Sequence, residues 1–280
     1  MGHQGHENEM AVKVEAEKIE YKTIARREIR EIFSDVLEST ELEKRLQEID
    51  NVRLVTPEQM DEIAKTNLKD AGAEGLIRYE IKGAKVRRVP IVMMGHSRAN
   101  TLHTFLHESV HLMSPPALLS PLNHLLEPDE QTFSDFVGGY MFERLVADNS
   151  LDYSKILGTV QDHNQQMLFW EAITDWLAAD DKVFNDEELK EIENSGYFER
   201  HMINYLWEQC PDSQVFFRAL KESYVQGDAT PLKRFLQKIT ETQDDQMYDQ
   251  MLEIMGRGKK DSTQISDWKA MVKKYFKTNT

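Results

Sequence analysis

The sequence predicts a mostly helical α+β protein with one small antiparallel sheet or hairpin. Most of the chain repeats its apolar residues every three or four positions, which is the period of an amphipathic helix. Residues 77–94 instead alternate apolar and charged residues around Gly83-Ala84, which predicts a β-hairpin. A third stretch, residues 101–113, combines the helical pattern with three histidines and carries the main functional motif of the chain.

The N-terminal region is expected to be helical before the first strand. Residues 1–10 predict a polar, disordered leader, and residues 11–49 carry apolar residues at helical spacing with a break at Ser39-Thr40. A short strand is expected at residues 51–56. The next helix should run from Thr56-Pro57 to about Leu68, since threonine caps helices well and proline suits their first position.

The predicted hairpin leads directly into the histidine-bearing helix. Gly72 and Gly75 are expected to mark a turn before it. Pro90 lies inside the second strand and has no N–H to donate to a neighbour, so we expect this strand to lie at an edge. Residues 101–113 should then form a helix with Asn100 as its N-cap and Ser114-Pro115-Pro116 as its end.

After the histidine-bearing helix, the sequence predicts a loop punctuated by prolines, from Pro115 to Pro128, and then a series of helices. Breaks fall at Pro211 and at Gly256-Arg-Gly258. The expected helices cover residues 130–148, 167–179, 186 onwards, 197–209, 214–226 and 265–276, with more than one helix between residues 231 and 255.

Charge and composition exclude several classes of partner. A net charge of −15 argues against nucleic acid and against an anionic membrane surface. Cys210 is the single cysteine, so no internal disulfide can form. No apolar run approaches the roughly 20 residues of a membrane span, and the N-terminus lacks the basic and apolar parts of a signal peptide. We therefore expect a cytoplasmic protein, or one exported without a recognisable signal peptide.

The motif His107-Glu108-Ser-Val-His111 predicts a metal site. Four residues advance an α-helix by slightly more than one turn, so the two imidazoles lie on one face about 6 Å apart along the axis. Neutral imidazole is a good ligand for Zn²⁺, and Glu108 can accept a proton from a water molecule that the metal activates. The chemistry that this pattern indicates is hydrolysis.

A third ligand is needed, and Glu171 is the best candidate. Glu171 and Asp175 are the only charged groups in a strongly apolar helical segment, residues 167–179, and they lie one turn apart on one face. Two buried carboxylates are costly unless they meet a cation or hydrogen-bond donors. We expect Glu171 to bind the metal and Asp175 to accept the free ring N–H of a ligand histidine.

Other metal-binding candidates fit less well. His103 lies about 12 Å along the helix axis from His111, too far to share one ion. His124 and Glu127 lie in a proline-rich connection and His163 in a polar stretch, where surface or capping roles are expected. The third histidine and glycine of the metzincin pattern do not follow the first pair.

His107-Glu-x-x-His111, followed sixty positions later by Glu171-x-x-x-Asp175, resembles the gluzincin group of zinc metallopeptidases, of which thermolysin is the best-known member. The resemblance implies one Zn²⁺ per chain, held by His107, His111 and Glu171. It makes Glu108 the general base and has Asp175 orient His107. A hydrogen-bond donor to the oxyanion should come after the third ligand in the sequence. Tyr197, His201 and Tyr205 lie on one face of a predicted helix there, and we favour Tyr197 as the donor, with His201 second.

The resemblance also implies a domain plan and a substrate class. A zincin-like catalytic domain is expected over residues 51–240, with the sheet and active-site helix at 51–113 and the helical part carrying the third ligand at 114–240. Helical extensions should cover residues 1–50 and 241–280. The implied function is that of a zinc endopeptidase acting on a protein or peptide, with the strand before the active helix bordering the cleft as an edge. The alternative is a non-proteolytic binding or structural protein on the same scaffold; the sequence leaves the oligomeric state open.

Overall fold

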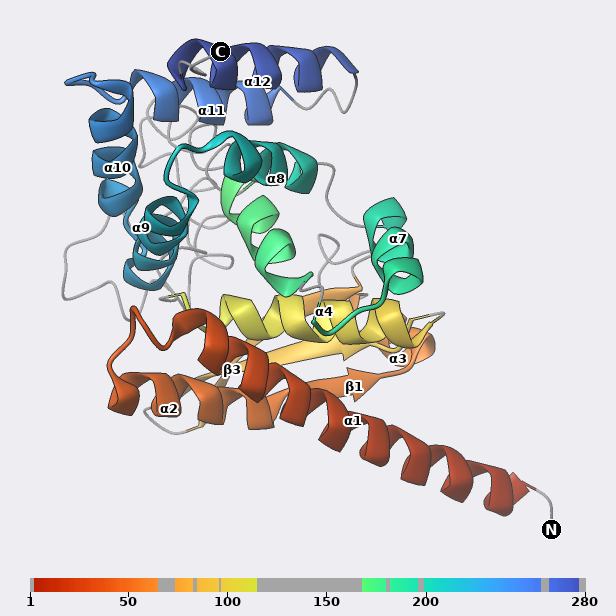
Figure 1. The fold of residues 1–280 in the computed structure, drawn as a ribbon. Helices are drawn as coiled ribbons and strands as arrows, with labels where there is room; N and C mark the ends of the chain where they lie inside the picture. The colour runs from red at the N-terminus through yellow and green to blue at the C-terminus, as the bar shows by residue number, and fades with distance from the viewer. Residues whose placement is uncertain are drawn as a thin grey trace, which may run out of the picture. The chain divides into compact units, whose positions relative to one another are not determined.

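The computed structural model describes most of the chain, and its described part is mostly helical with a small mixed sheet (Figure 1). The described residues are 3–64, 74–82, 85–95, 97–114, 168–179, 182–195, 199–257 and 262–276. The predicted helix at 130–148 lies outside them, as do His124, Glu127, His163 and Tyr197. The described chain divides into two compact units, residues 1–113 with 177–196, and residues 114–176 with 197–280.

The first unit contains the sheet and the histidine-bearing helix α4. Its elements are α1 (His3–Phe33), α2 (Ser39–Glu48), the 3-10 turn η1 (Ile49–Asn51), β1 (Arg53–Val55), α3 (Pro57–Ala64), β2 (Gly75–Lys82), β3 (Lys85–Met93), α4 (Arg98–His111) and α7 (Asp186–Ser195). Helix α4 packs on β2 and β3, and α1 packs on α4, with the rings of Tyr21 and Phe105 6.0 Å apart. A small core of Val55, Met60, Val89 and Ile91 joins the sheet to α3.

Local capping explains where several of these helices begin. Thr56 and Gln59 form a reciprocal pair at the start of α3, in which the Thr56 hydroxyl accepts from the Gln59 N–H and the Gln59 side chain accepts from the Thr56 N–H. Asn185 caps α7 by accepting from the N–H groups of Glu187 and Glu188. The expected helix starts at Pro57 and Asp186 are confirmed.

The sheet confirms the hairpin and corrects the place of its second strand. β2 and β3 pair antiparallel, from Gly75 opposite Val92 to Lys82 opposite Lys85. β1 pairs parallel on the other side of β3, so among the described strands β3 is central and the prediction that Pro90 marks an edge is wrong. The proline is tolerated because the β1 ladder involves only residues 91–93 and therefore starts after Pro90.

Two further expectations for this unit are wrong. Helix α1 begins at His3, so most of the segment expected as a disordered leader is helical; no proline interrupts residues 3–33 to stop it. Gly75, expected in a turn, is the first residue of β2, whereas Gly72 lies outside the described residues.

The second unit is helical throughout its described residues. After the helix of residues 168–178, which continues into the first unit at residue 177, its elements are α8 (Arg200–Gln209), α9 (Ser213–Gln226), α10 (Thr230–Thr240), α11 (Gln246–Gly256) and α12 (Ser262–Tyr275). Trp176, Trp207 and Phe217 pack edge to face or tilted, and the buried Trp268 ring donates to the Met202 carbonyl at 2.7 Å. The expected breaks at Pro211 and after Gly256 are confirmed.

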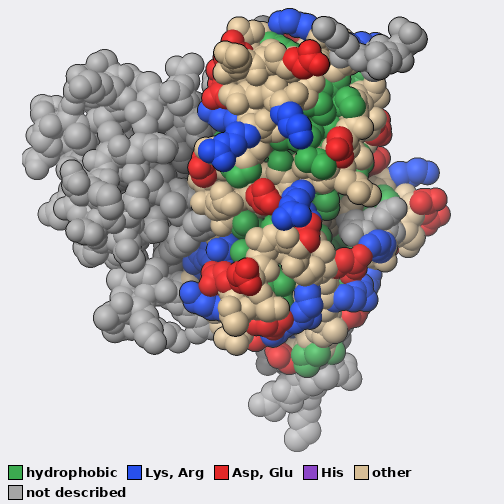
Figure 2. Space-filling view, turned by 60° about the vertical axis from the view of Figure 1, so that its left-hand side comes forward, with side chains coloured by type: hydrophobic (Ala, Val, Ile, Leu, Met, Phe, Trp, Pro, Cys, Tyr) green, Lys and Arg blue, Asp and Glu red, His purple; other side chains and the backbone are tan. Residues whose placement is uncertain are grey.

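Few large hydrophobic side chains are exposed in the described part of the chain. Within the described part of the chain, no helix is both long and apolar enough to cross a bilayer. Ile19 and Val215 are the large hydrophobic side chains that stand exposed there. On the face drawn in Figure 2, acidic and basic side chains are interspersed, so the net negative charge does not gather into a single acidic patch on that face.

Candidate metal centre

Helix α4 begins three residues earlier than expected. Its N-cap is Ser97, whose hydroxyl accepts from the Asn100 N–H at 3.1 Å, so the prediction that Asn100 is the cap is wrong. The hydroxyl of Thr101 donates to the Ser97 carbonyl and accepts from the Gly95 N–H at 2.8 Å. Arg98 lies in the first turn of α4. These bonds satisfy the first turn of the helix and fix the chain that leads into it.

Arginines from two other elements hold the end of α4. The buried Arg88 of β3 donates to the Leu112 carbonyl at 2.9 Å and to both carboxylate oxygens of Glu48, at 2.9 and 3.1 Å. Arg45 of α2 donates to the Met113 carbonyl. Carbonyls at a helix end have no partner within the helix, so these two cations fix the turn that carries His111.

His107 and His111 face one another on α4. Their Nε2 atoms are 3.1 Å apart, and the ring centroids are 4.8 Å apart. Two nitrogens bound to one tetrahedral Zn²⁺ at about 2.0–2.1 Å would be separated by about 3.3–3.4 Å. The spacing therefore suits a shared ion, and it equally permits one imidazole to donate to the other. Both side chains are buried, with 7% and 6% of their surface exposed.

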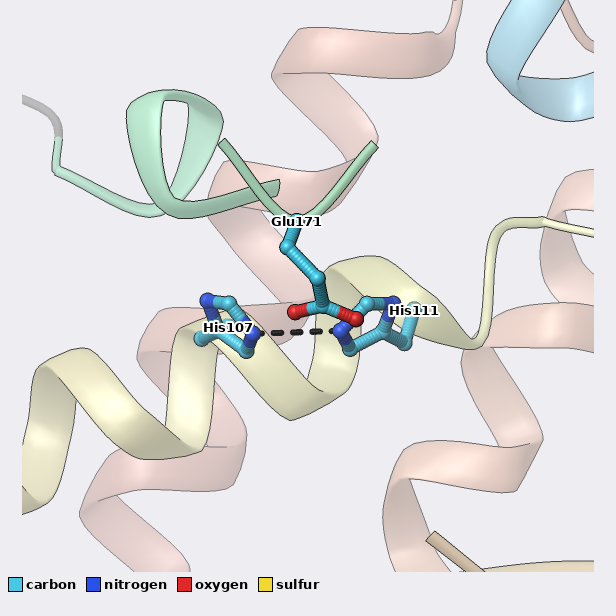
Figure 3. A group of neighbouring side chains, drawn as sticks. All are labelled: His107, His111 and Glu171. Carbon is cyan, nitrogen blue, oxygen red and sulfur yellow. Dashed lines mark hydrogen bonds between the residues drawn. The ribbon is translucent and has the colours of Figure 1, made fainter. Parts of the chain in front are cut away.

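Glu171 supplies the third possible ligand. It lies in the helix of residues 168–178, and the ligand atoms of His107, His111 and Glu171 all lie within 4.8 Å of one another (Figure 3). Two imidazoles and one carboxylate form a nitrogen and oxygen donor set that Zn²⁺ accepts in sites with one open position. The group can hold a metal ion, as the sequence predicted.

Glu108 is buried next to the sheet. Its side chain is 6% exposed and lies against Gly75 at the start of β2, so closely that a β-carbon at that position would stand 2.5 Å from its Oε1 atom. His103, which was not expected to be a ligand, packs its ring on Phe184 with centroids 6.3 Å apart. Glu108, the base predicted for hydrolysis, thus lies where α4 packs against the start of β2.

Asp175 lies in a buried ion pair of the second unit. Its carboxylate is 3.6 Å from the Arg200 guanidinium, and the residues are 1% and 7% exposed. The predicted contact between Asp175 and His107 stays a prediction. Arg200 was not predicted from the sequence, although it shares a helical stripe with Ile203 and Leu206. A cation on an apolar stripe indicates a buried anionic partner.

The expected oxyanion donors are only partly described. Tyr197 lies outside the described residues. His201 is exposed on α8 and, with Tyr205 and Lys269, lines a cleft of about 190 Å³ in the second unit. The Lys269 ammonium lies 5.3 Å from the centre of the Tyr205 ring. The role of either donor stays a prediction.

Comparison with known proteins adds no relative to this picture. No protein-family model matches the chain, and neither the search of curated proteins nor the search of solved structures finds a match.

Proposed function

We propose that this protein is a zinc-dependent metallopeptidase of the gluzincin type that hydrolyses peptide bonds in a protein or peptide substrate. The observation that carries the proposal is the group of His107, His111 and Glu171, with Glu108 buried on the same helix as the two histidines. A purely structural zinc site has no use for a general base. A buried carboxylate that directly follows the ligand His107 in the sequence, and is kept away from bulk water, supports a catalytic role for Glu108.

The chemistry follows from the three groups and one further carboxylate. When bound, Zn²⁺ would lower the pKa of a water molecule and polarise the scissile carbonyl. His107 and His111, neutral, and Glu171, ionised, would hold it and leave one position open. Glu108 would take the proton from the attacking water and deliver it to the leaving amine. Tyr197, or else His201, would donate to the oxyanion.

The position of β2 supports an extended peptide as the substrate. Within the described sheet β2 pairs only with β3, so its other side is an edge. This edge begins at Gly75, beside Glu108. An extended chain can add to such an edge through main-chain hydrogen bonds. In the proposal, β2 borders the substrate cleft. From the sequence, this role was expected for the strand directly before α4.

The metal is tested by measuring zinc in the purified protein. We expect one Zn²⁺ per chain, lost in the double variant His107→Ala, His111→Ala. His103→Ala is the matched control, because it removes a buried histidine of the same helix that lies outside the ligand group. Full zinc occupancy in the double variant would refute the ligand assignment.

Catalysis is tested with a fluorescence-quenched peptide library. Glu108→Gln keeps the shape of the side chain but cannot accept a proton, so we expect normal folding and zinc content and at least about a 10²-fold loss of hydrolysis. Glu191→Gln, an exposed carboxylate bonded to Asn100 at the other end of α4, is the matched control and should retain activity. Equal behaviour of Glu108→Gln and wild type in every assay would favour the binding or structural alternative.

A further inference from the structure

Gly75 is the point at which β2 touches the helix that carries the proposed base. A β-carbon built on Gly75 would lie 2.5 Å from Oε1 and 2.9 Å from Cγ of Glu108, and 2.8 Å from Cγ2 of Thr104. Carbon and oxygen atoms that do not form a strong bond are usually about 3.3–3.6 Å apart or more. No side chain larger than hydrogen fits at this position without a shift of about 1 Å in its neighbours.

The Thr104 side chain cannot easily make that space. Its hydroxyl donates to the Asn100 carbonyl at 2.9 Å, and a β-branched side chain held by this bond keeps its methyl group in place. Because Glu108 is only 6% exposed, its carboxylate has few other places to go. A substitution at position 75 must therefore displace the Glu108 carboxylate or push β2 away from α4.

We infer that Gly75 is a positioning residue for the Glu108 carboxylate; this inference rests on the proposed function for its kinetic consequence. The missing β-carbon lets the strand edge and the base approach within contact distance. The base is thereby placed beside the edge at which an extended substrate would pair. Gly75 itself has no group that can take part in the reaction, so it acts only through Glu108.

The backbone at Gly75 makes the test specific. Among the described glycines only Gly227 has a positive φ, so alanine at position 75 meets no backbone strain and the effect comes from the added β-carbon. Gly95 provides the matched control: a β-carbon there would meet its nearest neighbours, on Asn100 and Thr101, at 3.5 Å, which is ordinary van der Waals contact.

The kinetic experiment compares Gly75→Ala with Gly95→Ala in the peptide-cleavage assay. A shift of about 1 Å in a catalytic group can cost up to about 100-fold, so we expect kcat to fall about 10- to 100-fold in Gly75→Ala. Zinc content should not change, and Gly95→Ala should retain wild-type kcat. Wild-type kcat in Gly75→Ala, or a loss explained by lost zinc, would refute the inference.

A double-mutant cycle separates positioning from general damage. If Gly75→Ala acts by misplacing Glu108, adding Glu108→Gln should cost less in the Gly75→Ala background than in wild type. In the Gly95→Ala background the cost of Glu108→Gln should be unchanged. Independent losses that simply multiply in the Gly75→Ala background would show that Gly75 acts on something other than Glu108.

A crystal structure of metal-free Gly75→Ala tests the inference without any activity. We expect the Glu108 carboxylate to move by about 1 Å or to turn away from β2, with the rings of His107 and His111 unmoved. If β2 retreats and Glu108 stays in place, the inference is wrong. If the wild-type protein cleaves no peptide, the proposed function fails, and this structural readout still decides the role of Gly75.

Discussion

Replacing Arg88 by methionine should destabilise α4 far more than replacing an exposed arginine. Arg88 is 8% exposed and satisfies the carbonyl of Leu112, itself 0% exposed. Losing a charged donor to a buried carbonyl costs about 1.5–3 kcal/mol. The lost pair with Glu48 adds at most about 1 kcal/mol, because the Glu48 side chain is 28% exposed and regains water. Methionine keeps an apolar stem, so we expect a total of about 2–4 kcal/mol.

The matched control is Arg26→Met on α1. Arg26 donates to the Asp50 carboxylate at 2.9 Å, as Arg88 does to Glu48, but the two side chains are 31% and 51% exposed. Exposed pairs of this kind contribute about 0–1 kcal/mol. Arg88 differs from Arg26 in its deeper burial and in its bond to the Leu112 carbonyl. The comparison therefore measures what a buried arginine bonded to the end of α4 contributes beyond an exposed ion pair.

The assay is native-state amide exchange of α4 in metal-free protein, with increasing urea. It gives the free energy of opening for this helix separately from the rest of the chain. We expect Arg88→Met to lower it by about 2–4 kcal/mol and Arg26→Met by less than about 1 kcal/mol. Equal exchange in the two variants would refute the argument that Arg88 stabilises the end of the helix beside His111.

Two further predictions concern buried groups of the second unit. Asp175→Ala should weaken zinc binding about 10–100-fold while zinc still binds, as measured by chelator competition; complete loss of zinc in Asp175→Ala with retention in Glu171→Ala would exchange the two roles. Burial raises the pKa of the Cys210 thiol to about 11, so the thiolate is scarce at pH 8 and labelling by a thiol reagent should be at least about 10²-fold slower in native protein than in urea-unfolded protein. Equal labelling rates in the two states would show that Cys210 is accessible and ionises normally.

The sequence alone determined those features that depend on neighbours along the chain. The helical spacing of His107 and His111, the hairpin around residues 83–84 and the helix start at Pro57 follow from period, turn and cap chemistry within a few residues. Glu171 was found because two carboxylates in an apolar helix need a cation, an energetic argument that requires no coordinates. The two histidines and Glu171 do form a group that can hold a metal ion.

Tertiary structure decided what depends on residues far apart in the sequence. The central place of β3 arises from its pairing with β1, which lies more than thirty residues earlier. The presence of Pro90 in the sequence does not show whether another strand pairs on that side of β3. Arg88 at the end of α4 and Gly75 against Glu108 are likewise long-range contacts. In sequence the first is one charged residue in an alternating strand and the second a turn-forming glycine. Their roles come from the side chains that folding brings against them, because packing and burial are properties of the assembled core.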